Sequence, residues 1–383
     1  GEDNPEVQQA HERGIPVIKR AEMLGELMRL KFSVGIAGTH GKTTTTSMIG
    51  KILRHANLQP TLIVGGVVAE LGTGATLGAG EYLVTEVDEY DRSIYSTFPS
   101  LAVVLNVEPD HLDCYRDEAD LLDAFVSYMN RVPFYGSVVL SADDNRLSGV
   151  MERVTRPMKT FGFSPHADYR AVDVVLEKGQ SSFAVFCRDE FLGKLHLTVP
   201  GRHNVANALA ATAAATELEV PFATIADALA EFTGVGRRFE LVGTANGITV
   251  IDDYAHHPTE INATLSTARQ QFDGRIIAVF QPHLYSRTRD FLPDFVTSLA
   301  AADQCILTDI YPAREEPIPG ITSDRIRQEA QKAGYDHFEY VGKKENAIEA
   351  VVSLARPGDT VLIIGAGSIT HIRNDLLRRL EAE

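Results

Sequence analysis

A glycine-flanked turn between an apolar strand and a helix constrains the fold more than any other segment: Gly38-Thr39-His40-Gly41-Lys42-Thr43-Thr44. The run Phe32 to Ala37 before it is typical of a buried strand, and the residues after it place Met, Ile and Leu on one helical face. The turn therefore opens on a helix N-terminus, where free N–H groups and the helix dipole attract phosphate oxygens. There Lys42 can reach the β and γ phosphates, and the Thr43 hydroxyl can ligate Mg²⁺. The sequence predicts a nucleoside triphosphate site.

The turn departs from the usual phosphate-binding pattern at one position. The pattern has a glycine five residues before the Gly-Lys pair, and this chain has Ile36 there, with glycines at Gly35 and Gly38 instead. A strand-to-helix turn rich in Gly and Thr, without a ligand, is the alternative interpretation. The flanking strand and helix favour the phosphate site.

Length and charge narrow the class of protein. At 383 residues the chain is long enough for two or three domains, and hydrophobic residues, 44% of the total, can fill their cores. A net charge of −16 argues against a broad nucleic-acid or anionic-membrane surface. The three cysteines, Cys114, Cys187 and Cys305, have no metal or redox spacing. No apolar run approaches the roughly 20 residues that cross a bilayer, so we expect a soluble cytoplasmic protein without membrane insertion.

The order of apolar and amphipathic segments predicts an α/β fold. Short strands alternate with helical patterns, which implies a mostly parallel sheet with helices on its faces, followed by a second doubly wound, Rossmann-like unit after a boundary near 233–237. Stretches of residues 159–200 alternate between apolar and polar side chains, which is typical of antiparallel strands added to the sheet. Expected elements are strands at 82–85, 101–106, 137–140, 182–187, 194–199, 248–251, 276–280, 305–307, 338–341 and 360–364, and helices at 118–130 and 204–218.

The first residues look like the end of an earlier domain. Asp3-Asn4-Pro5 is typical of a helix cap, the helix should end near Gly14, and Ile15 to Ile18 reads as a strand. One helix and one strand cannot bury their apolar faces alone. We expect residues 1–30 to be the remnant of a domain that precedes the triphosphate domain.

Acidic residues and a histidine follow two strands of the first predicted sheet. Glu86 and Asp88 come at the end of one strand, and Asp110 and His111 follow the next. Ligands of open parallel sheets bind at this edge, where carboxylates and an imidazole can hold two Mg²⁺ ions against a reacting phosphoryl group. Solvated acidic loops are the alternative.

Two further segments carry polar groups that suit a nucleotide. Asn204 and Asn207 fall on one face at the start of an Ala-rich helix, where they can read an adenine edge or cap the helix. Arg237 and Arg238, near the predicted domain boundary, can clamp phosphate or form a surface ion pair.

Histidines and acids gather after two strands of the second predicted sheet. Asp252-Asp253-Tyr254-Ala255-His256-His257-Pro258 follows one strand, and Gln281-Pro282-His283 with Arg287 and Arg289 follows the next. The two loops should share a sheet edge. A zinc site is an alternative for the first loop, but no further ligand stands at a suitable spacing. Gly365 to Ser368, after the last strand, is a tight turn or a ligand contact.

In this order the motifs resemble those of the Mur ligase superfamily, over essentially the whole chain from Asn4. Among its members, the chain is most similar to those that attach L-alanine to UDP-N-acetylmuramate. The resemblance implies three domains: a UDP-sugar domain of which 1–30 would be the end, a central ATPase at 31–235 and a C-terminal amino-acid domain at 236–383. The motifs that carry it are Gly38 to Thr44, Glu86-Val-Asp-Glu, Pro109-Asp-His111, Gly201-Arg-His-Asn, Arg237-Arg-Phe, Asp252 to Pro258 and Gln281-Pro-His283.

The resemblance also implies a role for each candidate residue and two cofactors, ATP and Mg²⁺, with two ions. Several superfamily members use a carbamylated lysine, which we expect to be absent because no lysine lies between Lys51 and Lys159. L-alanine and UDP-N-acetylmuramate would be the substrates of a monomer or weak homodimer. The ATP site would comprise Gly38, Thr39, His40, Gly41, Lys42, Thr43, Thr44, Asn204, Asn207, Arg238 and Asp253; the metal ligands would be Thr43, Glu86 and His111; and the catalytic groups would be Lys42, His256, His257, His283 and Arg287.

Four other functions remain open from the residues. A recycling ligase of the same superfamily, which attaches a preformed tripeptide to the same nucleotide sugar, shares the phosphate turn and the His-His-Pro loop, although Gln281-Pro-His283 favours the alanine enzyme. A folate polyglutamylating ligase fits His40 and that loop poorly. A P-loop hydrolase or switch that makes no bond, and a non-catalytic nucleotide-binding module, are the alternatives from other classes.

Overall fold

At the start of the chain, the structure confirms the predicted helix and contradicts the predicted strand after it. A computed structural model describes residues 3–68, 73–109 and 114–382. The helix α1 (Pro5–Glu12) begins after Asn4, whose side chain accepts a hydrogen bond from the Glu6 N–H. Residues 15–18, predicted as a strand, have no regular structure and lead directly to α2 (Arg20–Arg29). Their β-branched residues have no neighbouring strand to pair with, and propensity alone does not make a strand.

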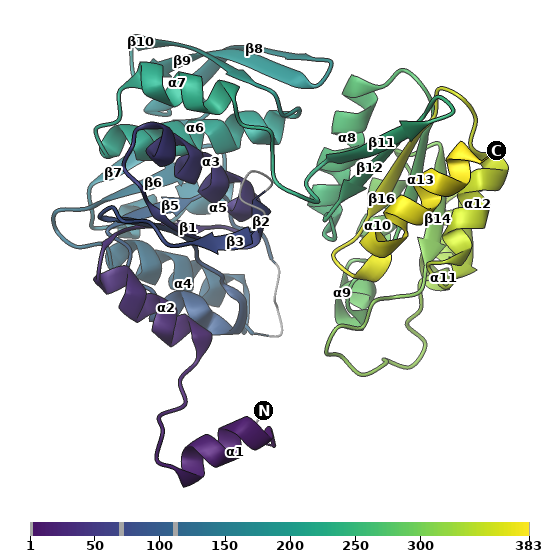
Figure 1. The fold of residues 1–383 in the computed structure, drawn as a ribbon, viewed down its shortest axis with the longest axis horizontal. Coiled ribbons are helices and arrows are strands. Elements are labelled where there is room, and N and C mark those ends of the chain that lie inside the picture. Colours follow the sequence, from purple (N-terminus) through teal and green to yellow (C-terminus); the bar gives the residue numbers. More distant parts are fainter. Residues whose placement is uncertain (1–2, 69–72, 110–113, 383) are drawn as a thin grey trace. The chain divides into compact units, whose positions relative to one another are not determined.

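Contacts divide the chain into two compact units, each built around its own β-sheet with helices beside it (Figure 1). The first comprises Gly1–Val174, Phe183–His196 and Asn204–Phe232; the second comprises Val175–Ser182, Leu197–His203 and Thr233–Glu383. None of the described helices is both long and apolar enough to span a bilayer.

A mostly parallel sheet forms the core of the first unit. Its ten described strands run in the order β10-β9-β8-β7-β6-β5-β1-β4-β2-β3, with β1 between β4 and β5 and parallel to both. The strands are β1 (Phe32–Ala37), β2 (Thr61–Val68), β3 (Thr73–Thr76), β4 (Tyr82–Glu86), β5 (Leu101–Val104), β6 (Ser137–Ser141), β7 (Met158–Gly162), β8 (Tyr169–Glu177), β9 (Gln180–Cys187) and β10 (Glu190–Leu197).

The helices of this unit that follow α1 and α2 include the helix predicted after the phosphate turn. They are α3 (Lys42–His55), α4 (Glu118–Asn130), α5 (Asn145–Ser148), α6 (Arg202–Glu217) and α7 (Phe222–Ala230), with short 3₁₀ segments η1 (Tyr90–Ser96) and η2 (Met151–Arg153). The sequence did not predict β2 and β3. Gly65 and Gly66 interrupt β2, and glycines weaken a strand pattern.

The second unit is a doubly wound sheet, as predicted. Its strands run in the order β11-β12-β16-β13-β14-β15, and all neighbouring pairs are parallel except β11 with β12. Successive residues of β13 alternate between two cores, one with α8, α10 and α11, and one with α12 and α13. The elements are β11 (Glu240–Ala245), β12 (Ile248–Asp253), α8 (Pro258–Gln271), β13 (Ile276–Phe280), α9 (Tyr285–Asp290), α10 (Leu292–Leu299), β14 (Gln304–Thr308), α11 (Asp324–Lys332), β15 (Phe338–Gly342), α12 (Asn346–Leu354), β16 (Thr360–Ile364), η3 (Ser368–Ile372) and α13 (Arg373–Glu381).

Candidate functional site

The turn between β1 and α3 has the backbone geometry of a phosphate cradle. Gly38 has φ +141° and Gly41 has φ +83°, backbone conformations that residues with a Cβ rarely adopt. A Cβ on Gly41 would also lie 2.5 Å from Oδ1 of Asn207. The turn therefore needs its glycines both for backbone conformation and for space, and it ends at the N-terminus of a 14-residue helix.

Residues after β5 hold this turn in place. The N–H of His40 donates to Oδ1 of Asn106 at 2.8 Å, and Nδ2 of Asn106 donates back to the His40 carbonyl at 3.0 Å. The N–H of Glu108 donates to the Thr39 hydroxyl at 2.9 Å, and the Glu108 carboxylate lies 3.2 Å from Nε2 of His40. His40 and Thr39 are thus occupied in bracing the turn, and its N–H groups keep a fixed direction.

Lys42, the predicted phosphate ligand, is surrounded by acceptors and carboxylates. Its ammonium donates to the Gly38 carbonyl at 2.6 Å and to Oε2 of Glu89 at 2.9 Å, and Asp88 lies 3.8 Å away. Burial opposes the charge of Lys42, but the attraction of Glu89 and Asp88 outweighs it and raises the pKa of the ammonium above its usual value. The group is therefore a fixed positive charge at neutral pH.

The predicted metal ligands of the first unit lie together, next to the turn. The Thr43 hydroxyl donates to Oε2 of Glu86 at 3.2 Å, and Oε1 of Glu86 accepts from the Gly65 N–H at 2.7 Å. A hydroxyl and a carboxylate are hard oxygen donors of the type that Mg²⁺ prefers, so the two residues fit this ion. Thr44, in the same helical turn, is buried. His111, the proposed ligand of a second ion, lies outside the described residues.

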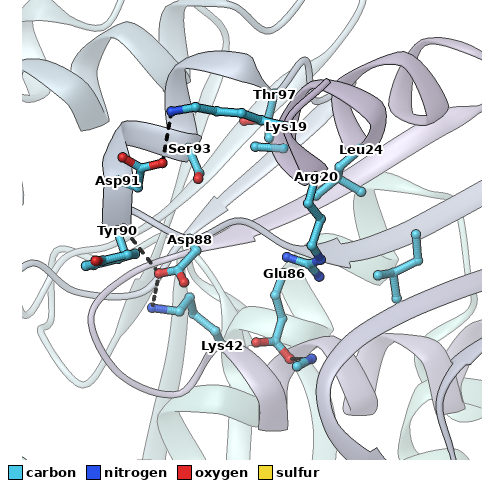
Figure 2. Close-up of a pocket in the computed structure, with 13 residues that line it drawn as sticks. Lys19, Arg20, Leu24, Lys42, Glu86, Asp88, Tyr90, Asp91, Ser93 and Thr97 are labelled. Carbon is cyan, nitrogen blue, oxygen red and sulfur yellow. Dashed lines mark hydrogen bonds and ion pairs between the residues drawn. The ribbon is translucent and has the colours of Figure 1, made fainter. Parts of the chain in front are cut away.

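A cavity of about 400 Å³ opens beside Lys42 and Glu86. Figure 2 shows Lys42, Glu86 and Asp88 along one side and Lys19 and Arg20, from the start of α2, across from them. Lys19 pairs with Asp91 at 3.1 Å. Sequence reasoning missed the basic residues of α2, because nothing in the linear pattern relates them to the phosphate turn.

The predicted adenine ligands form a buried pair. Nδ2 of Asn207 donates to Oδ1 of Asn204 at 3.3 Å, and Asn207 borders Gly41. The structure thus brings the amide pair to the end of the phosphate turn.

In the second unit, aromatic and imidazole rings form a continuous row at the carboxyl ends of the strands. The rings of Tyr254 and His256 are 5.5 Å apart, those of His256 and His283 are 5.8 Å apart, and His283 stacks on Tyr311 at 5.7 Å with an interplanar angle of 23°. Nη1 of Arg287 is 3.3 Å from Nδ1 of His283. The two predicted loops therefore do share one edge, and Tyr311, from the loop after β14, completes the row.

Two guanidinium groups lie against the other end of this row. Arg237 and Arg238 have their guanidinium carbons 4.7 Å and 5.0 Å from the centre of the Tyr254 ring. Arg237 also donates to the Gly365 carbonyl at 2.6 Å, and Arg238 lies 3.8 Å from Glu260. Arg237 thus links the turn after the last strand to the row, and Arg238 remains a candidate phosphate ligand.

Two candidates of the second unit have evident structural tasks. His257 is the N-cap of α8, where Nδ1 accepts from the Thr259 N–H at 3.4 Å. Asp253 accepts hydrogen bonds from the N–H groups of Phe239 and Ala255 and from the Thr264 hydroxyl. Burial raises the pKa of Asp253, although Arg238 and these N–H groups oppose the shift. Both residues shape the loop that carries His256.

Comparisons with family models cover most of the chain. Residues 36–215 match the Mur ligase middle domain, residues 237–367 match the description "Mur ligase, glutamate ligase domain", and residues 1–32 match "Mur ligase family, catalytic domain". A relative from Geobacter sp. (strain M21), named UDP-N-acetylmuramate–L-alanine ligase, is 47% identical over 100% of this chain and 83% of its own length. The chain belongs to the Mur ligase family. A relative of the same name from Salinibacter ruber is 48% identical over 99% of this Mur ligase and 80% of its own length.

Solved structures of Mur ligases share the fold. The UDP-N-acetylmuramate-alanine ligase MurC from Thermotoga maritima superposes with a TM-score of 0.84 at 28% identity, covering 100% of this chain and 83% of its own. A murein peptide ligase from Psychrobacter arcticus gives a TM-score of 0.74 at 26% identity, covering 100% of this chain and 84% of its own. These matches confirm the predicted α/β class and the predicted superfamily.

Proposed function

We propose that this protein uses ATP to join L-alanine to the carboxylate of UDP-N-acetylmuramate, a step of peptidoglycan precursor synthesis in the bacterial cytoplasm. The observation that carries the proposal is the 47% identity, over the whole chain, to a relative named for this reaction. The phosphate turn and its charged neighbours supply the matching chemistry. A carboxylate is a poor electrophile, so the γ-phosphoryl group of ATP is first transferred to it; the alanine amine then attacks the acyl phosphate, and phosphate leaves.

The first unit supplies the groups for phosphoryl transfer. The turn N–H groups and Lys42 bind the phosphates and stabilise the negative charge that develops on them. Mg²⁺, held by Thr43 and Glu86, supplies further positive charge to the phosphate oxygens when it is bound. His111 is proposed for a second ion. Asn204 and Asn207 face the adenine.

The second unit supplies the groups for the incoming amine. His256 and His283 are candidates for the base that takes its proton, because imidazole titrates near neutral pH. Arg287 orients His283 through its 3.3 Å contact, and His257 and Asp253 hold the loop that carries His256. Arg238 is proposed to contact the phosphates. The domain boundaries at residues 30 and 235 and the monomeric or weakly dimeric state remain predictions.

One observation favours a second candidate. The murein peptide ligase from Psychrobacter arcticus shares the fold over the whole chain. Attachment of a preformed tripeptide to the same nucleotide sugar is therefore the alternative, less well supported because the sequence relatives named above are alanine ligases.

Phosphate release separates these functions. The protein is assayed with ATP, Mg²⁺ and UDP-N-acetylmuramate, and L-alanine is compared with other amino acids and the tripeptide. We expect release only when the sugar nucleotide and L-alanine are both present. Preference for the tripeptide would select the recycling reaction, and release with ATP alone would select a hydrolase or switch.

A further inference from the structure

Every N–H of the Lys42 ammonium already has an acceptor in the first unit. It donates to the Gly38 carbonyl at 2.6 Å, to the Thr39 carbonyl at 3.4 Å and to Oε2 of Glu89 at 2.9 Å. An ammonium has three donors and no more. A phosphate oxygen can therefore bind Lys42 only by displacing one of these acceptors.

Glu89 is the acceptor that a phosphate competes with directly. The two carbonyls belong to the turn that carries Lys42 itself, so they stay beside the ammonium whatever else binds. Glu89 is an anion held by attraction to the same charge that attracts a phosphate. Asp88 is also near Lys42, at 3.8 Å, but its side chain is 55% exposed and water screens it.

The surroundings of Glu89 make its displacement costly. Its side chain is only 3% exposed, and within the part of the chain that the structure describes Oε1 is buried without a hydrogen-bond partner. Its backbone carbonyl accepts from the Tyr115 hydroxyl at 2.7 Å, which fixes the chain at this point. A carboxylate that lost Lys42 here would remain buried and uncompensated beside the phosphates, an unfavourable arrangement unless another cation replaces the ammonium.

We propose that Glu89 makes nucleotide binding depend on a divalent cation, because it competes with the terminal phosphate for Lys42 and its own charge must then be offset by the cation that accompanies the nucleotide. Glu86 lies in the same cavity wall as Lys42 and adds to the negative charge that the cation offsets (Figure 2). Glu89 thereby discriminates against metal-free ATP. The inference rests on the ATP site proposed above and assigns to Glu89 a task that none of the predicted site residues has.

Calorimetric titration with ATP, in EDTA and in excess Mg²⁺, measures this discrimination. Glu89→Gln removes the charge and nearly preserves the volume; we expect it to bind metal-free ATP about tenfold or more tightly than the wild type, with a clearly smaller gain for ATP with Mg²⁺. Glu231→Gln is the matched control, since it removes one negative charge beside another lysine of α3, Lys51, at an exposed position away from the turn. It should change either affinity by less than about threefold.

A double-mutant cycle tests whether Glu89 acts through Lys42. In the Lys42→Met background, the gain that Glu89→Gln gives for metal-free ATP should fall below about threefold, because no ammonium remains to compete for. A gain that persists would mean that Glu89 only repels the nucleotide and would overturn the competition. If thermal unfolding shows that Glu89→Gln does not fold, Glu89→Ala takes its place in the titration. We expect it also to raise the affinity for metal-free ATP.

The outcomes separate this inference from the function on which it rests. Wild-type protein that binds no ATP with Mg²⁺ would overturn both. Wild-type protein that binds ATP with Mg²⁺, together with a Glu89→Gln variant that gains nothing in EDTA, would overturn the inference alone. The same holds if Glu231→Gln gains as much as Glu89→Gln.

Discussion

The two units hold their candidate groups by different means. In the first, backbone hydrogen bonds and ion pairs fix the phosphate turn: Asn106 and Glu108 brace it, and Glu89 pairs with Lys42. In the second, ring contacts align His256 and His283 between Tyr254 and Tyr311. The first arrangement suits a ligand of fixed shape and high charge. The second suits a proton transfer, which needs an imidazole held at a set angle.

The comparison predicts that the largest single effect comes from the charge in the first unit. Lys42→Met removes the ammonium that we propose stabilises the transferred phosphoryl group, and we expect phosphate release to fall by about a thousandfold or more. Lys51→Met is the control, because Lys51 lies in the same helix but pairs with Glu231. If Lys42→Met kept more than a tenth of the activity, the N–H groups of the turn would stabilise the negative charge of the phosphates without Lys42.

A second experiment tests whether the turn depends on space as well as charge. Gly41→Ala places a Cβ 2.5 Å from Oδ1 of Asn207 at a residue with φ +83°. We expect the affinity for ATP, measured by calorimetry, to fall by about a hundredfold, because the turn must shift away from the amide pair.

Gly334→Ala is a matched control for that substitution. Gly334 has φ +87° and no atom within 4 Å of an added Cβ, so it has the backbone strain without the contact. It should cost about 1 kcal/mol of unfolding free energy and leave ATP affinity unchanged. Equal ATP affinity in the two variants would disprove the steric argument.

Tyr311 provides the corresponding test in the second unit. Tyr311→Leu removes the ring on which His283 stacks, and we expect kcat/KM for L-alanine to fall about tenfold while the KM for ATP stays within about twofold. The pH profile of kcat should also change shape if His283 carries the proton. Tyr311→Phe keeps the stacked ring and should behave as the wild type. Parallel losses for ATP and alanine would indicate a folding defect instead.

The smallest effect is a pH dependence that distinguishes the buried charges of the two units. In the first unit Glu89 and Asp88 raise the pKa of Lys42 in spite of burial, whereas burial dominates at Asp253 and raises its pKa. A carboxyl group with a raised folded-state pKa stabilises the fold at low pH, and this contribution is lost as pH rises through that pKa.

Denaturant unfolding of wild type and Asp253→Asn, from about pH 4 to pH 7, measures the effect. The unfolding free energy of the wild type, relative to the variant, should decrease as pH rises, because only the wild type must ionise a buried carboxyl. A difference that grows with pH would mean that Arg238 and the backbone donors outweigh burial. Asp294→Asn, an exposed change on α10, is the control and should show no trend.

Several elements could be predicted because their signals are local. The strand β13 (Ile276–Phe280) and the helix α4 (Glu118–Asn130) have the predicted bounds, since each is a continuous periodic segment between turn residues. The glycine-rich β2 and the irregular residues 15–18 were predicted wrongly or not at all. Their state depends on neighbouring strands, about which a local pattern contains no information.

By itself, the sequence determined the family, the α/β class and the phosphate turn, because a nucleotide cradle depends on consecutive residues with fixed backbone requirements. Only the tertiary structure decided which distant side chains meet: Glu89 on Lys42, Asn207 against Gly41, and Tyr311 under His283. These pairs are 47, 166 and 28 residues apart in the chain. The order of strands in the two sheets, and not the order of residues, places them within contact distance.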